Sequence, residues 1–224
     1  MPEWSPEFTR APFSLYSTYL FQTTVNIFAV NDDPVQSAKD LPDKLVVKMP
    51  TESLQMLAPW AFNAHGCFIQ KPDGTRYGTK GFAHHPCSKW LYENPSNVSW
   101  LLDHAFALCD EYTRRYGKEH GTVYGLTQIR SLFLEHYGDR RPSSEHTEFV
   151  QAMPDEFRVP GDSVQAYRNY INGYKGYAVW NFSEKPDWWD EATHEPVRKQ
   201  YLAEREAKRM KRQNDKHSSV PSTV

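Results

Sequence analysis

Two lysines and a carboxylate near the start of the chain have side chains that could carry chemistry. Lys44 and Lys48 are four residues apart, so on a helix they share one face, and Glu52 follows on the next predicted helix. Two ammonium groups so placed repel each other unless an anion or a carboxylate lies between them. A DNA phosphate is one such anion, and the alternative interpretation is a solvated basic face.

A second candidate for chemistry is the pair His104 and Glu111. Their spacing of seven residues places them on one face of a helix. A carboxylate that orients an imidazole makes a normal acid–base unit. The alternative is the exposed polar face of an amphipathic helix.

Two His-x-Cys pairs raise the question of a metal. His65 and Cys67 form the first pair, and His85 and Cys87 form the second. Together they could make a Cys2His2 zinc site, although structural zinc sites usually have tighter ligand loops. We therefore expect buried thiols and capping histidines, with no metal and no cofactor required.

Basic residues beside aromatic ones are typical of segments that contact phosphate. The run Arg114-Arg115-Tyr116-Gly117-Lys118 has this composition, and Arg168 and Lys175 share another helix face. The predicted DNA-phosphate contacts are Lys44, Arg114, Arg115, Lys118, Arg158, Arg168 and Lys175. The predicted base-stacking or pocket residues are His85, Trp90, Tyr167 and Trp180. The alternative for the tyrosines between 167 and 177 is a place in the core.

These residues must be positioned by helices, because apolar residues recur mostly at helical spacing. The expected helices begin at Pro34 after an acidic cap, at Thr51, at Asn94 or Ser96, at Val123, at Asp162 or Ser163, and at Glu191. Pro42 and Pro50 should divide the second region into short helices. The long helix should end at Tyr116 before Gly117, and later ones at Tyr137, Tyr177 and Lys216. Short extended pieces are expected at 25–30 and 66–81.

The domain organisation follows from the same patterns. We expect an irregular N-terminal extension over 1–24, one compact, mainly α domain over 25–190, and a charged helical tail over 191–224 that ends in disorder. The tail is basic, with eight Lys or Arg and four Asp or Glu between His194 and His217, while the whole chain has a net charge of −2. Near-neutral charge argues against a protein that coats nucleic acid by charge alone.

Location and partners are constrained by further features. The three cysteines form no Cys-x-x-Cys pair, which fits a reducing cytoplasm. No apolar run approaches the length of a membrane span, and no signal-peptide pattern begins the chain. We expect a cytoplasmic protein with no membrane partner. Aromatic residues reach 14%, which suits a packed core and also suits stacking on unpaired bases.

Four blocks between Val25 and Trp189 resemble, in order, a family of phage proteins labelled pyrimidine-dimer DNA glycosylase. They are VNIFAVNDDPVQSAKDLPDKLVVKMPTESLQML, HHPCSKWLYENPSNVSWLLDHAFALCDEYTRRYGKEH, FVQAMPDEFR and AYRNYINGYKGYAVWNFSEKPDWW. More remotely, the layout is similar to the endonuclease V type of glycosylase, whose fold the chain should then share. By position, the resemblance makes Glu52 the candidate for the catalytic glutamate of that type, with Lys48 beside it.

The resemblance implies double-stranded DNA as the partner, in the cytoplasm of an infected cell. Enzymes of the endonuclease V type attack the sugar C1′ with their N-terminal α-amine, yet here 24 residues precede the matching segment. Lys44 or Lys48 could replace that amine as a nucleophile. Loss of the amine favours a transferase that joins a free amino acid to an activated 5-methylene group of thymine in thymidine hypermodification, with restriction evasion as its role. The alternatives are a pyrimidine-dimer or modified-pyrimidine glycosylase and AP lyase, and a non-catalytic DNA-binding or protein-binding module.

Overall fold

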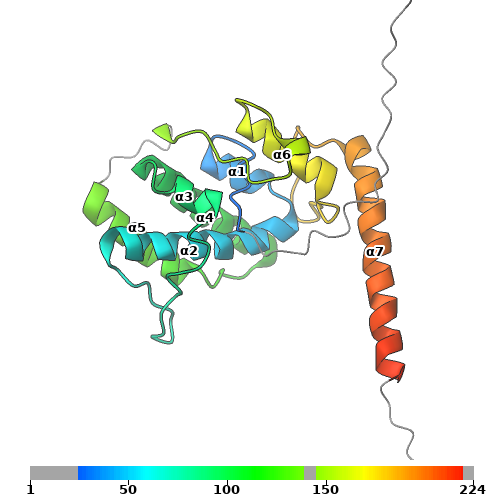
Figure 1. Cartoon of the computed structure of the whole chain (residues 1–224), viewed down its shortest axis with the longest axis horizontal. Helices are drawn as coiled ribbons and strands as arrows, with labels where there is room; N and C mark the ends of the chain where they lie inside the picture. The colour runs from blue at the N-terminus through cyan, green and yellow to red at the C-terminus, as the bar shows by residue number, and fades with distance from the viewer. Residues whose placement is uncertain (1–24, 139–144, 219–224) are drawn as a thin grey trace, which may run out of the picture.

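The helix α4 (Pro95–Tyr116) is the element against which most of the chain packs, as the computed structural model of residues 25–138 and 145–218 shows (Figure 1). Asn94 caps its first turn and Gly117, at φ 66°, ends it, both as predicted. Its predicted apolar stripe from Val98 to Cys109 is buried. α1 (Pro34–Asp40), α2 (Asp43–His65) and α5 (Val123–Tyr137) pack against α4. The expected mainly α, single-domain fold is confirmed.

Of the two prolines predicted to divide this region, Pro42 separates α1 from α2, but Pro50 does not interrupt α2. This helix runs without a break through Pro50 and Pro59. Proline inside a helix removes one backbone hydrogen bond and clashes with the preceding turn, at about 3 kcal/mol. Leu54 and Leu57 are fully buried on this helix, which packs along α4. We infer that burial of this face outweighs the local cost of the prolines.

The few short strands expected are not formed in the described residues, and the segment 25–30 is instead a buried extended segment, the alternative to a strand. Residues 25–30 are extended and buried but pair with no other strand. A side chain holds the end of this segment in place of a neighbouring strand, since the Val30 N–H donates to the Ser37 hydroxyl of α1. In the segment 66–81, one isolated bridge joins Gln70 and Arg76. Backbone groups that find side-chain partners have no need of a sheet.

Three smaller elements lie between α2 and the tail: α3 (Pro86–Trp90), the 3₁₀ turn η3 (Asp155–Phe157) and α6 (Ser163–Tyr174). Asp162 caps α6 as predicted. The helix ends at Tyr174 and not at Tyr177, because Lys175 leaves helical geometry at φ −87° and ψ 68°. This early end brings the Lys175 side chain back over its own helix.

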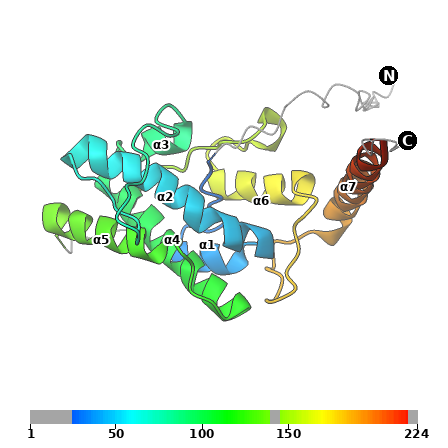
Figure 2. The same cartoon turned by 90° about the horizontal axis from the view of Figure 1, so that it is seen from below.

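The tail helix α7 (Glu191–Ser218) lies at one edge of the molecule beside α6 and projects away from the body (Figures 1 and 2). It extends two residues beyond the predicted end. Its attachment to the body is very close at Gly176, where a Cβ atom would lie 2.5 Å from the Tyr201 Cβ and 2.7 Å from the Val197 carbonyl oxygen. No larger residue fits there without displacement of α7.

Two predictions fall outside the described residues, namely the irregular extension over 1–24 and disorder over 219–224. Within the described residues, no helix is long and apolar enough to span a membrane.

Candidate functional site

Glu52 is a buried carboxylate with a defined set of partners. It lies on α2 with 6% of its surface exposed. One carboxylate oxygen accepts the backbone N–H of Asn26 at 3.0 Å, and the other pairs with the Lys48 ammonium one helical turn earlier. Burial raises the pKa of Glu52, because the loss of water outweighs the opposing attraction of Lys48 and the Asn26 hydrogen bond. Such a carboxyl group can hold a proton nearer neutrality than an exposed one.

The segment that contacts Glu52 is held in an unusual conformation. The Asn26 side-chain oxygen accepts the N–H groups of Ile27 and Phe28, and its amide donates to the Ala152 carbonyl. Phe28 is buried with a positive φ of 44°, which is rare for a residue with a large side chain. Its ring stacks parallel to that of Tyr170 at 5.9 Å. Strained residues of this kind concentrate at functional sites, because the surrounding structure must hold them.

Lys175 is the amine of this site. Its Nζ donates to the Tyr170 hydroxyl at 2.7 Å and lies 4.1 Å, 5.1 Å and 5.3 Å from the ring centres of Tyr170, Tyr174 and Phe28. Burial lowers the pKa of Lys175 to about 7. Repulsion from Lys48 and Lys44 adds to this effect, and attraction to Glu52 opposes it. Near neutral pH, a large fraction of this amine is therefore unprotonated and nucleophilic.

A groove of 590 Å³ lies between the start of α2 and α7, and Glu52 and Lys175 are not among its lining residues. Lys44 lines it, with its ammonium 4.4 Å from the centre of the Tyr177 ring. Its other basic and aromatic lining residues are Tyr116, Phe182, Arg198, Tyr201 and Arg205, and the rest are Asp43, Val179, Asn181 and Leu202. Positive charge with aromatic rings in one concave surface suits a nucleic acid.

Comparison with known proteins agrees with this geometry. Residues 25–123 match the family of pyrimidine dimer DNA glycosylases. The match includes Asn26, Lys48 and Glu52, while Lys175 lies beyond its end. It supports a glycosylase-like protein that acts on DNA. No solved structure matches the chain.

The predicted pair of His104 and Glu111 is not formed in the structure. His104 is fully buried against Trp100, and neither of its ring nitrogens has a hydrogen-bond partner among the described residues. Burial lowers the pKa of His104 to about 3, so the ring is neutral. Glu111 instead pairs with Arg114 and Arg115. The spacing correctly predicted that His104 and Glu111 share one face of the helix, but that face points into the core.

Arg115 corrects a second prediction, because it is enclosed and unavailable to a phosphate. Its guanidinium donates to Asp43 at 3.0 Å, to Glu111 at 3.0 Å and to the carbonyls of Leu41 and Lys39. Burial alone would raise the pKa of Glu111, but hydrogen bonds from both arginines hold it below its usual value. This network fixes the start of α2 against the end of α4.

We expect Arg115→Met to destabilise the fold by about 3–5 kcal/mol, because it leaves the buried Asp43 carboxylate without its cation and removes one of the two arginines that pair with Glu111. The matched control is Arg114→Met, whose side chain is 52% exposed and should contribute less than about 1 kcal/mol. Urea denaturation measures both changes. Equal losses in the two variants would show that Arg115 is not the centre of the network.

The predicted base-stacking residues lie mostly in the core. Trp90 and Tyr167 are fully buried, and the Tyr167 hydroxyl donates to the Val150 carbonyl. Trp180 is buried and donates to the Asp40 carbonyl. His85 accepts the Cys87 N–H as the cap of α3, which is the capping alternative. None of these four side chains is placed to stack on a base in this conformation.

The zinc alternative also fails for geometric reasons. Among the described residues, no group of three or more His, Cys, Asp or Glu side chains converges to hold a metal ion. Cys87 is fully buried, and burial raises the pKa of its thiol to about 12. A thiol that resists deprotonation is a poor metal ligand.

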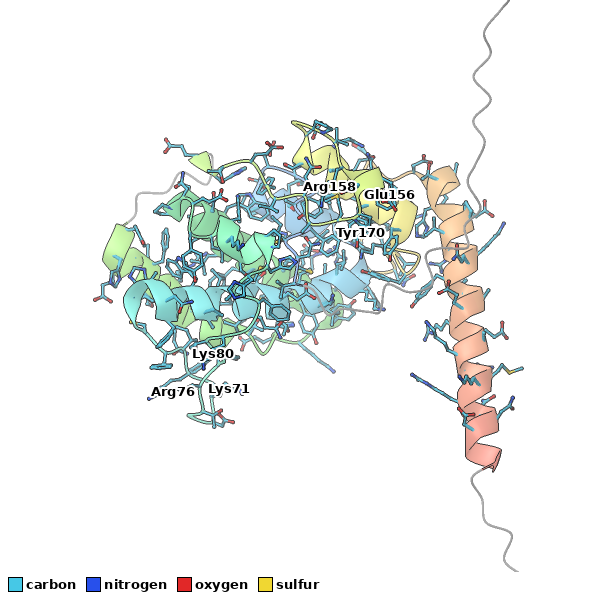
Figure 3. All side chains as sticks on the ribbon, in the orientation of Figure 1. Lys71, Arg76, Lys80, Glu156, Arg158 and Tyr170 are labelled. Atoms are coloured by element: carbon cyan, nitrogen blue, oxygen red, sulfur yellow. The ribbon has the colours of Figure 1, made fainter. Side chains whose placement is uncertain are left out.

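The remaining phosphate candidates lie on different surfaces. Arg114 is partly exposed and its guanidinium also donates to the Phe182 carbonyl beside the groove, while Lys118 is exposed after α4. Arg158 is exposed near α6 and pairs with Asp155 (Figure 3). Arg168 is half-buried and donates to the Val30 carbonyl, so it supports the strained segment more than it faces solvent.

Sequence reasoning missed two features of the surface. It predicted that Lys175 contacts phosphate, which assumes a protonated ammonium group. Nothing in the sequence signals that burial lowers the pKa of this amine. Sequence reasoning also interpreted the segment 66–81 as short extended pieces and assigned no role to its basic residues Lys71, Arg76 and Lys80, which lie on one side of the molecule away from α6 (Figure 3). Their separation by two or more residues in a polar loop hides this common placement.

Proposed function

We propose that the protein acts on a pyrimidine base in double-stranded DNA as a glycosylase and AP lyase, with Lys175 as the nucleophile and Glu52 as the acid–base group. The observation that carries this proposal is the enclosure of the Lys175 amine by aromatic rings, where the Glu52 carboxylate acts on it electrostatically. The nitrogen hydrogen-bonded to Glu52 in the family-matching segment belongs to the Asn26 peptide, and an amide nitrogen is not a nucleophile. A side-chain amine must then take this role.

The steps follow from the two groups. The unprotonated Nζ attacks C1′ and forms a C–N bond, while the bond from C1′ to the base breaks and the base leaves with the electron pair and takes up a proton. The nitrogen then loses a proton, and the sugar ring opens as Glu52 protonates the ring oxygen, which leaves an iminium between Lys175 and C1′. Lys44 and Lys48 would hold the adjacent phosphates.

Borohydride trapping tests the proposal. The protein is mixed with a duplex that contains one thymine dimer or one abasic site, and the iminium is reduced to a stable amine. We expect a covalent protein–DNA adduct whose modified peptide contains Lys175. An adduct on Lys44 or Lys48 would move the nucleophile, and no adduct with either duplex would contradict the lyase chemistry.

Amino acid transfer to an activated thymine methylene remains a second candidate. It is favoured by the excess of positive charge, since Lys44, Lys48 and Lys175 all act on Glu52 or on each other. That cluster would hold a leaving phosphate or the carboxylate of the incoming amino acid. Labelled amino acid, incubated with the protein and DNA that carries activated thymine, should then enter the DNA while borohydride traps nothing.

A further inference from the structure

The helix α7 carries four arginines on one face. At about 100° per residue, Arg198, Arg205, Arg209 and Arg212 fall within an arc of about 60°. We name these four arginines the arginine stripe. From Glu195 onward, the acidic residues of α7 fall outside that arc: Glu195, Glu204, Glu206 and Asp215. Glu191, in the first turn of the helix, falls within the arc and pairs with Lys185. Between Arg198 and Arg212 this face concentrates cations and excludes carboxylates, which makes it complementary to a polyanion.

The arginine stripe is continuous with the groove between the start of α2 and α7. Arg198 and Arg205 line the groove from α7, and Lys44 lines it from α2. Lys44 is close enough to Lys175 to lower its pKa. A track of positive charge therefore begins at Lys44, passes through the groove and continues along α7.

The dimensions of this track suit a duplex. Arg198 and Arg212 are fourteen residues apart, which corresponds to about 21 Å along a helix. Duplex DNA rises about 3.4 Å per base pair, so this length matches about six base pairs. The stretch from His194 to His217 holds eight Lys or Arg residues, although the whole chain has a net charge of −2. The arginine stripe accounts for half of these eight.

We propose that the arginine stripe and the groove bind the phosphate backbone of the duplex beside the target base. This inference rests on the proposed function only in taking double-stranded DNA as the ligand. It makes α7 a part of the DNA interface and not a detached tail. Arginine suits this role, because its planar guanidinium can donate two hydrogen bonds to one phosphate.

Fluorescence anisotropy with an undamaged 24-base-pair duplex tests the inference, because it measures binding without any chemistry. The test variant Arg205→Gln with Arg209→Gln removes two charges from the stripe. The control, Lys199→Gln with Lys211→Gln, removes two charges from other faces of α7. We expect about a tenfold weaker Kd for the test variant at moderate salt. Its plot of log K against log salt should flatten by about 1.8, the value for two lost phosphate contacts.

The control variant should keep the Kd and the salt slope of the unaltered protein, and circular dichroism should show that both variants retain α7. Equal weakening of both variants would mean that α7 acts by general charge and would overturn the stripe. If the unaltered protein binds the duplex and the test variant binds it equally well, this inference alone is overturned. Absence of duplex binding by the unaltered protein would overturn both this inference and the proposed function.

Discussion

Replacement of Lys175 by methionine is expected to lower single-turnover cleavage of the glycosidic bond in dimer-containing DNA by at least about three decades. The proposed reaction forms its covalent bond at this nitrogen, and loss of a nucleophile removes the whole covalent route. Methionine keeps an apolar chain over the rings of Phe28 and Tyr170, so the enclosure stays filled. Lys89→Met, on an exposed lysine of α3, is the control and should react at the unaltered rate. Full activity of Lys175→Met would remove the lysine from the mechanism.

The same residue predicts two pH effects. The pKa of Lys175 is lowered to about 7, so the rate of glycosidic-bond cleavage should rise from about pH 6 to about pH 8 as the amine loses its proton. The free energy of unfolding should also rise with pH between about 7 and 10.5, because in that range the unfolded state binds the proton and the folded state does not. Lys175→Met should lack this contribution to stability. A rate independent of pH across the first range would contradict the assignment.

Glu52→Gln is expected to fold and bind DNA while its turnover falls by about two to four decades, the usual range for a general acid–base group. A glutamine oxygen can still accept the Asn26 N–H, so the segment 25–30 should keep its place. The variant cannot protonate the sugar oxygen. Glu119→Gln, on an exposed carboxylate, is the control. If Glu52→Gln changes only the free energy of unfolding, then Glu52 is a structural residue of α2.

A second readout separates these two roles for Glu52. Its negative charge holds the pKa of Lys175 higher than burial and the neighbouring lysines would leave it. Loss of that charge should shift the rise of the residual rate to lower pH. A residue that only stabilised the fold would leave the pH profile in place.

Local sequence rules predicted the helices that depend on caps. The long helix α4 ends where Asn94 and Gly117 place its ends, and α5 has the predicted bounds. The same rules failed at Pro50, where burial against α4 outweighs the local preference of proline. Helix boundaries that depend on tertiary packing cannot be read from neighbouring residues alone.

The site was only partly predictable, for a similar reason. Glu52 and Lys48 lie one helical turn apart, so their pairing follows from local spacing. Lys175 acquires its low pKa from enclosure by Phe28, which comes from the opposite end of the described chain and is held there at a positive φ. No pattern around Lys175 records that contact. The prediction for His104 failed for the opposite reason. Its spacing correctly placed it on the same helix face as Glu111, but that face is buried and not exposed.

The absence of a side chain at Gly176 gives DNA binding and chemistry a common structural basis. Gly176 directly follows Lys175, and α7 packs so closely on it that a Cβ atom there would clash with Val197 and Tyr201. We therefore expect a shift of either backbone to displace the other. A ligand that holds α7 in its docked position therefore also holds the backbone of the proposed nucleophile. By thermodynamic reciprocity, whatever orders Lys175 at the sugar must tighten the grip of α7 on the flanking duplex by the same factor. The protein would then select its target through the fit of the whole bound segment, before any bond is broken.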